Sequence, residues 1–225
     1  MSKLVWDKEG EHRYETGVKN CALYVHDGQN YGTGVPWNGI TGITESPSGA
    51  EANPLYADDT KYLNLYSVEE IGATVEAYTY PDEFAECDGS ASIATGVNIG
   101  QQARKTFGLA YKTVVGNDTE ANDYGTKIHI LYGCKASPSE KAYATINDSP
   151  VAITFSWELT TTPVEVTGYK KTASVTIDTT KFSTPELKKK LQTLEDKLFG
   201  SETEEPTLLM PDEIIALIGK NVVSG

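Results

Sequence analysis

The sequence has little that would tie the chain together covalently, bind a metal or hold it in a membrane. It contains only three cysteines, Cys21, Cys87 and Cys134, and an odd number of widely spaced thiols predicts neither a disulfide framework nor paired zinc ligands. No apolar run approaches the roughly 20 residues that span a bilayer. Residues 1–17 carry charges throughout and lack the apolar segment of a secretion signal. These absences favour folding in a reducing cytoplasm.

Positive charge is also scarce. The chain has 19 lysines and arginines against 32 aspartates and glutamates, a formal net charge of -13. Tight, static binding of nucleic acid, or adsorption to an anionic membrane, requires fixed cations against phosphate groups. The composition excludes both for the surface as a whole.

Groups suited to catalysis follow no known motif. The three histidines lie in no nucleophile or metal motif: His12, His26 and His129. His129 alternates with Ile128 and Ile130, which predicts the polar face of a strand. Three groups of carboxylates could supply a glycosidase acid and base, although acids in loops and at helix starts need no such role: Asp58–Asp59, Glu69–Glu70, and Asp82 with Glu83, Glu86 and Asp88. We predict no enzyme activity, no catalytic residue, no metal and no cofactor.

Strand patterns dominate residues 18–178. The clearest is "VAITFSWELT", where alternate residues share one apolar face: Val151, Ile153, Phe155, Trp157 and Leu159. Similar runs occur at 18–26, 61–67, 72–80, 105–115, 127–134, 141–146, 163–168 and 173–178. Many short strands separated by turn residues predict a mainly β fold, an antiparallel sandwich or barrel over residues 18–182.

Helix signals are confined to a few places. Pro81, followed by acids and closed by Gly89, predicts a short helix over 81–88. A Ser183 to Glu186 capping box opens an amphipathic helix over 183–200. Its apolar stripe either covers one end of the chain's own barrel or packs on a neighbouring subunit: Leu187, Leu191, Leu194 and Leu198. Residues 201–225 read as an acidic linker followed by a short apolar helix, "MPDEIIALIG".

The segment 43–60 reads as an unusually long loop. Structureless connections beyond about 12–15 residues are uncommon in a compact domain unless they bind something. Tyr56, Tyr62 and Tyr66 cluster beside it, a composition that suits docking onto another protein. The other tyrosines and tryptophans suit core packing, with a sugar-stacking platform as the alternative.

Several segments in a fixed order resemble the major tail proteins, or tail tube proteins, of long non-contractile-tailed bacteriophages (siphoviruses) and prophages of Gram-positive bacteria. The resemblance runs from about residue 15 to 219. The matching segments are "GVKNCALYV", "GVPWNGITGITESPSGAEANPLYADDTKYLNLYS", "ATVEAYTYPDEFAECDG", "KTFGLAYKT", "KIHILYGC", "SWELTTTPVEV" and "MPDEIIALIG".

The resemblance implies a structural virion protein with a tail tube-like fold and no catalytic residues. Copies would assemble in the host bacterial cytoplasm into hexameric rings that stack as a hollow tube around a tape-measure protein. The tube would meet a tail terminator and a distal tail protein, and would conduct double-stranded DNA without binding it tightly. Two alternatives remain open: a tube protein of a contractile tail or type VI secretion-like machine, and a carbohydrate-binding β-sandwich module.

Residue-level expectations follow from this resemblance and from the charge balance. The loop 43–60 would be mobile in the monomer and become ordered on assembly, and the N-terminal arm 1–17 could act similarly. The expected subunit-interface residues are Leu55, Tyr56, Tyr62, Tyr66, Leu187, Leu191, Leu194 and Leu198. The lumen should lack fixed cations that would retard DNA. The expected lumen residues are Thr74, Glu76, Thr154, Ser156 and Glu158.

Overall fold

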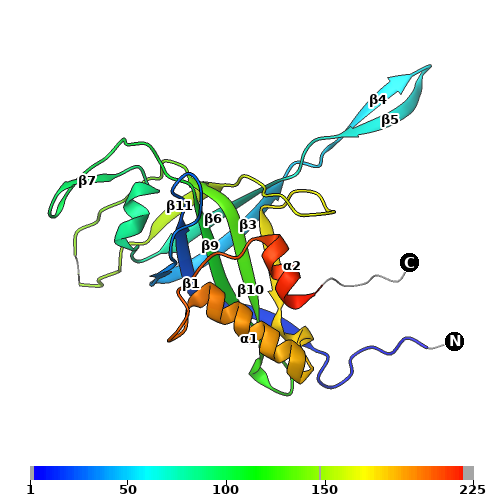
Figure 1. Cartoon of the computed structure of the whole chain (residues 1–225). Coiled ribbons are helices and arrows are strands. Elements are labelled where there is room, and N and C mark those ends of the chain that lie inside the picture. Colours follow the sequence, from blue (N-terminus) through cyan, green and yellow to red (C-terminus); the bar gives the residue numbers. More distant parts are fainter. Residues whose placement is uncertain (1–2, 147, 220–225) are drawn as a thin grey trace.

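The computed structural model of the protein describes residues 3–146 and 148–219 and is mainly β, with antiparallel sheets and two α-helices (Figure 1). The ends of the expected N-terminal arm (1–2) and C-terminal segment (220–225) lie outside the described residues. The strands are β1 (Arg13–Val25), β2 (Val35–Trp37), β3 (Ile40–Ser48), β4 (Ala52–Ala57), β5 (Thr60–Tyr66), β6 (Glu70–Ala77), β7 (Ala91–Ala94), β8 (Val97–Ile99), β9 (Phe107–Asn117), β10 (Ala121–Ala136), β11 (Phe155–Thr160) and β12 (Ser174–Asp178). The helices are α1 (Pro185–Phe199), α2 (Pro211–Ile218) and two 3₁₀ turns, η1 (Asp82–Glu86) and η2 (Thr179–Lys181).

The long strand β10 joins two layers of sheet. The strand order is β2-β1-β9-β10-β11-β6-β3, and β12 also pairs with β10. Residues 127–131 of β10 pair with β12, whereas Lys135 and Ala136 pair with β11. Between these two stretches Gly133 adopts a φ of 59° beside a break in register with β9. The strand therefore passes from one layer to the other at a glycine, the residue that adopts this conformation without strain.

The main core fills the space between the two layers. Trp157 of β11 is fully buried there and meets Trp37 of β2 and Phe84 of η1 edge to face, with ring centroids 5.5 and 5.1 Å apart. Such aromatic pairs add to the area that they bury. The alternation predicted for "VAITFSWELT" is confirmed from Phe155 to Thr160. It is wrong at its start, because Val151 precedes the strand and is exposed.

Where the two α-helices cover its outer side, the β1-β9-β10 layer is buried on both faces, whereas the first half of β1 is exposed. Tyr24 and Tyr132 cross from this layer to the helices, where their hydroxyls donate hydrogen bonds to the carbonyls of Leu198 and Leu209, the second at 2.8 Å. Strands buried on both faces lose the polar–apolar alternation of a half-solvated strand. The second core contains Ile128, Ile130, Ile177, Leu194, Leu198, Leu208, Leu209 and Ile214.

Two expectations for the first α-helix need correction. Its N-cap is Thr184, whose hydroxyl accepts a hydrogen bond from the Leu187 N–H at 3.2 Å, and not Ser183. Leu194 and Leu198 are fully buried against the chain's own sheet, so they are not available to a subunit interface. Of the two readings of the leucine stripe, the structure shows packing on the same chain.

Several other elements differ from their prediction in type or in bounds, and two predicted strands are absent. The predicted helix over 81–88 is the 3₁₀ turn η1, and the predicted strand at 18–26 begins earlier, at Arg13. Residues 141–146 and 163–168, both predicted as strands, form no strand longer than a single bridge. No helix among the described residues combines the length and the apolar composition needed to cross a membrane.

The three cysteines are free and buried. Burial disfavours the thiolate and raises the pKa of Cys21 and of Cys87 to about 12. These side chains therefore behave as small apolar groups with little reactivity.

Candidate assembly surface

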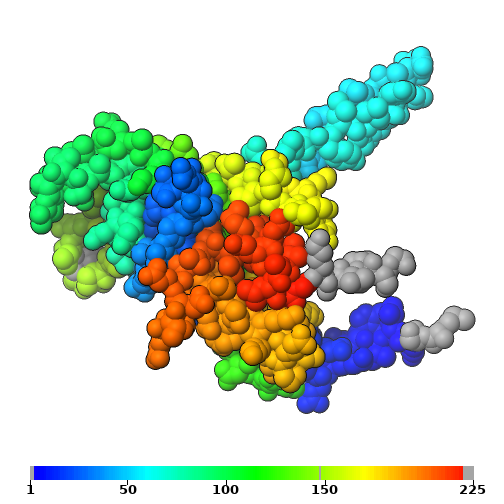
Figure 2. Space-filling view, in the orientation of Figure 1, coloured from blue at the N-terminus to red at the C-terminus, as the bar shows by residue number. Residues whose placement is uncertain are grey.

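The segment expected as a loop is a hairpin that projects from the body. Strand β3 continues to Ser48, and β4 and β5 then pair only with each other. Figures 1 and 2 show this hairpin, residues 52–66, standing clear of the remaining surface. The expectation of a structureless 43–60 was wrong because Pro54 and the polar residues at 44–53 mask the strand alternation.

The tip of the projecting hairpin is a two-residue turn. Ala57 pairs with Thr60, and Asp58 and Asp59 between them have φ values of 49° and 60°. Two left-handed residues are the signature of the type I′ hairpin turn, whose twist matches that of the strands. Aspartate is one of the few residues besides glycine that tolerates this conformation. The role of this acidic pair is therefore local, and the sequence argument missed it.

Both faces of the projecting hairpin carry large apolar side chains, next to Asn53 on one face and Lys61 and Asn64 on the other. Leu55 lies opposite Leu63, and Leu65 follows two residues later on the same face. Tyr56 lies on the other face opposite Lys61, where a break in register brings in Tyr62, and Tyr66 follows near the base. The exposed fractions of these leucines and tyrosines run from 39% for Leu63 to 72% for Tyr62. We call the two sides the leucine face and the tyrosine face.

The base of the hairpin is closed by hydrogen bonds. The Ser67 N–H donates to the Glu51 carbonyl at 3.2 Å, and the Glu51 N–H donates to the Ser67 hydroxyl at 3.0 Å. Gly49, with a φ of 85°, approaches the Val68 carbonyl so closely that a Cβ would lie 2.1 Å from that oxygen. The direction in which the hairpin leaves the body is thus set by backbone contacts at its base.

A second exposed apolar surface lies on the β7–β8 hairpin. Ser92 and Asn98 line a groove, and Ile93, Val97 and Ile99 of the same hairpin are exposed. The stretch from 90 to 103 contains no charged residue in this acidic chain. In Figure 1 the β7–β8 hairpin and the projecting hairpin lie on opposite sides of the body. We call the exposed side of β7–β8 the isoleucine face.

The residues expected in a lumen share one solvent-facing side of the β11-β6-β3 layer. Glu158 pairs with Thr74 and Ser156 pairs with Glu76, so the four side chains form adjacent cross-strand pairs. Thr154 precedes β11 and is exposed. These three strands contain no lysine or arginine. Their outer face is therefore a neutral to acidic surface.

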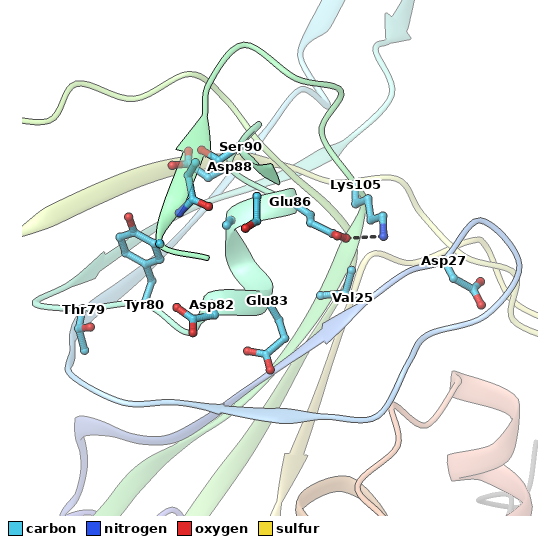
Figure 3. A pocket seen from close by; sticks show the side chains of 14 residues that line it. Val25, Asp27, Thr79, Tyr80, Asp82, Glu83, Glu86, Asp88, Ser90 and Lys105 are labelled. Atoms are coloured by element: carbon cyan, nitrogen blue, oxygen red, sulfur yellow. Dashed lines mark ion pairs between the residues drawn. The ribbon is translucent and has the colours of Figure 1, made fainter. Parts of the chain in front are cut away.

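The acidic groups of residues 82–88 line a groove of about 1020 Å³ next to β7–β8 (Figure 3). Glu86 forms an ion pair with Lys105. The carboxylate of Asp88 is buried and pairs with Arg104 at 3.4 Å and Lys141 at 2.5 Å, which fixes the connection that follows β10. Across residues 3–146 and 148–219 no cluster of histidine, cysteine and carboxylate ligands could hold a metal ion. The salt bridges along this groove connect separate segments of the chain.

A polar network that the sequence did not reveal closes one end of the space between the layers. The Tyr111 hydroxyl donates to Glu45 at 2.6 Å, and the Tyr111 ring stacks on His129 with centroids 4.9 Å apart. Glu15 accepts from Thr113 at 2.5 Å and pairs with Lys127. Partial burial opposes ionisation of Glu15, but these hydrogen bonds dominate and lower its pKa.

The network joins four strands, which explains why the sequence did not predict it. His129 was expected on the polar face of a strand, and it meets polar groups there: its side chain is mostly buried beside Glu15 and Glu45, 3.4 and 3.7 Å from their carboxylate oxygens. The partners come from β1, β3, β9 and β10. No local spacing links residues so far apart in the chain.

Comparisons with known proteins add little to this description. No family model and no curated protein matches the sequence. Among solved structures, a chain of a structure described as "Cryo-EM structure of the anti-feeding prophage (AFP) baseplate, 6-fold symmetrised" is 9% identical, with a TM-score of 0.35. The alignment covers 79% of this chain and 97% of that chain. At this level of likeness no conclusion about fold or function is drawn from it.

Proposed function

We propose that this protein is the tail tube subunit of a long non-contractile phage or prophage tail, which self-assembles into stacked hexameric rings. The observation that carries the proposal is the projecting hairpin, which exposes leucines and tyrosines on both sides. A two-stranded hairpin is marginally stable in water, and contiguous exposed apolar surface marks an interaction site. The kind of assembly, a tube of stacked rings, is proposed from the segment-by-segment sequence resemblance to tail tube proteins.

The outer face of β11-β6-β3 fits the lumen of such a tube. It presents Thr74, Glu76, Ser156 and Glu158 and no basic residue from these strands. Each phosphate neutralised by a fixed cation adds salt-dependent attraction to DNA, which a conduit must avoid. In a virion tail, the proposed partners of the tube are the tape-measure protein, the tail terminator and the distal tail protein.

Removing the projecting hairpin tests the proposal. Because Glu51 and Ser67 are already hydrogen-bonded, residues 52–66 can be replaced by two glycines without opening the body. The deletion should leave a folded monomer, since none of these residues belongs to either core, and it should form no tubes by sedimentation and negative-stain microscopy. A control that keeps the hairpin and changes only Asp58–Asp59 to Asn-Gly should assemble. Normal tubes from the deletion variant would refute the proposed role.

A carbohydrate-binding module predicts different behaviour. The projecting tyrosines would then bind a glycan in a stable monomer, by stacking of sugar rings on aromatic faces. A tube protein of a contractile or secretion-like machine predicts tubes that also bind a sheath. Assembly state therefore separates the binding module from both kinds of tube protein.

A further inference from the structure

We infer that the connection between β10 and β11 is a latent β-hairpin, whose two arms, residues 138–144 and 151–154, can close by extending the ladder between those strands. Neither arm belongs to a strand in the structure, although the apolar–polar alternation of 151–154 continues that of β11. Val151 is 89% exposed at the end of this pattern. The inference concerns the single folded chain, and it goes beyond the proposed function without depending on it.

The pairs that already join β10 to β11 fix the register that the arms would adopt. In an antiparallel ladder each step forward along one strand is a step back along the other. Continued without a break, the existing register places Ala142 opposite Ile153 and Ala144 opposite Val151. Pro150 lacks the N–H that a ladder needs, so the pairing would end before it. The chain therefore carries two arms of matched length at the open end of a ladder.

This register gives the closed hairpin one apolar and one polar face. Residues two apart along a strand point to the same side, so Ile153 and Val151 continue the buried face of β11. Ala142 and Ala144 join that face from the other arm, whereas Lys141 points to the opposite face. A slip of one residue would mix the two faces. The sequence of both arms is thus consistent with a single pairing, the one that the existing ladder sets.

An ion pair holds the first arm beside η1 instead. Lys141 Nζ lies 2.5 Å from the Asp88 carboxylate and 5.4 Å from the centre of the Tyr80 ring, and both partners line the groove shown in Figure 3. In the closed hairpin Lys141 would lie opposite Thr154, on the polar face. The buried Asp88 would keep Arg104, 3.4 Å away, as its partner. Closing therefore exchanges one ion pair for a ladder and leaves no buried charge unpaired.

Paired cysteines test the register directly. Ala144→Cys with Val151→Cys places two thiols at directly opposite positions, where a disulfide can form. The mismatched control, Ala144→Cys with Ala152→Cys, places them on opposite faces of the closed hairpin. All of these positions are exposed, so the body should fold as before. The native cysteines should not interfere, because they are buried and burial raises the pKa of Cys21 and of Cys87 to about 12.

The readout is the rate of intramolecular disulfide formation in the dilute, folded protein under mild oxidation, followed by mass spectrometry. The matched pair should close at least about tenfold faster than the mismatched pair, because the hairpin holds its thiols together. Lys141→Ala should accelerate closure of the matched pair further, whereas Lys105→Ala, which removes the ion pair with Glu86 in the same groove, should not. Equal rates for the two cysteine pairs, or no acceleration by Lys141→Ala, would overturn the inference.

Discussion

Leu55 and Leu63 lie directly opposite each other across the β4–β5 hairpin, yet both remain exposed to solvent. Such a cross-strand pair normally stabilises a sheet by packing on a covered face. Here no other element of the described chain covers it. The pair is therefore available to another molecule, and the proposed function follows from that availability.

The turn at the tip sets how well the hairpin is formed before it docks. Replacing Asp58 with Asn and Asp59 with Gly should relieve left-handed strain of about 1 kcal/mol, because φ is positive at both positions. Amide exchange in β4 and β5 should slow, and tubes should appear at a lower protein concentration. Asn at both positions removes the same charges without glycine, and serves as the control. Unchanged exchange with Asn-Gly would contradict the turn assignment.

The leucine stripe of α1 should show a gradient of stability. Leu198→Ala should lower the free energy of unfolding by about 2–5 kcal/mol, because the side chain is fully buried between helix and sheet. Leu187→Ala, near the start of the same helix and only half-buried, should cost about 1 kcal/mol or less. Urea denaturation of both variants measures the difference. Equal losses would mean that the helix does not pack as described.

The layer change at Gly133 should tolerate no side chain. Its φ is 59°, and an added Cβ would lie 2.3 Å from the Thr162 carbonyl oxygen, a backbone atom that cannot swing away. Gly133→Ala should therefore cost more than about 1 kcal/mol of stability by chemical denaturation. Gly168→Ala is a useful comparison, because Gly168 also has positive φ but has no neighbour near the added Cβ. Similar losses at both sites would show that backbone strain alone, without a steric clash, accounts for the effect.

Acid should weaken the network at the end of the sandwich. The pKa of Glu15 in the folded protein is lowered, since hydrogen bonds from Lys127 and Thr113 outweigh the effect of partial burial. Its contribution to stability is therefore present above the ordinary carboxyl pKa of about 4.5 and is lost as pH falls through the lower, folded value. Glu15→Gln should reduce stability at neutral pH and flatten its decline below pH of about 4.5. A decline of unchanged steepness would assign the acid sensitivity to other groups.

The fold class could be predicted because local sequence patterns specify most of its strands and helices. The alternation of Phe155, Trp157 and Leu159 identifies a half-buried strand, and Pro185 with the leucine stripe identifies the helix. Both patterns repeat within a few residues, so no knowledge of distant partners is needed.

The projecting hairpin and the polar network could not be predicted in the same way. The strand predicted at 61–67 is confirmed as β5, but β4 was not predicted, because Pro54 interrupts its pattern and the turn signal was Asp58–Asp59 rather than the commoner Asn-Gly or Asp-Gly. Glu15 and His129 meet only through the pairing of distant strands. Features of this kind depend on topology, which local spacing does not encode.

The central claim is self-assembly, and the most direct test is negative-stain electron microscopy of the purified, concentrated protein after incubation at moderate salt. The proposal predicts hollow tubes or six-fold rings whose formation depends on protein concentration. Persistent monomers at every concentration would contradict it, and saturable glycan binding by those monomers would favour a carbohydrate-binding module instead.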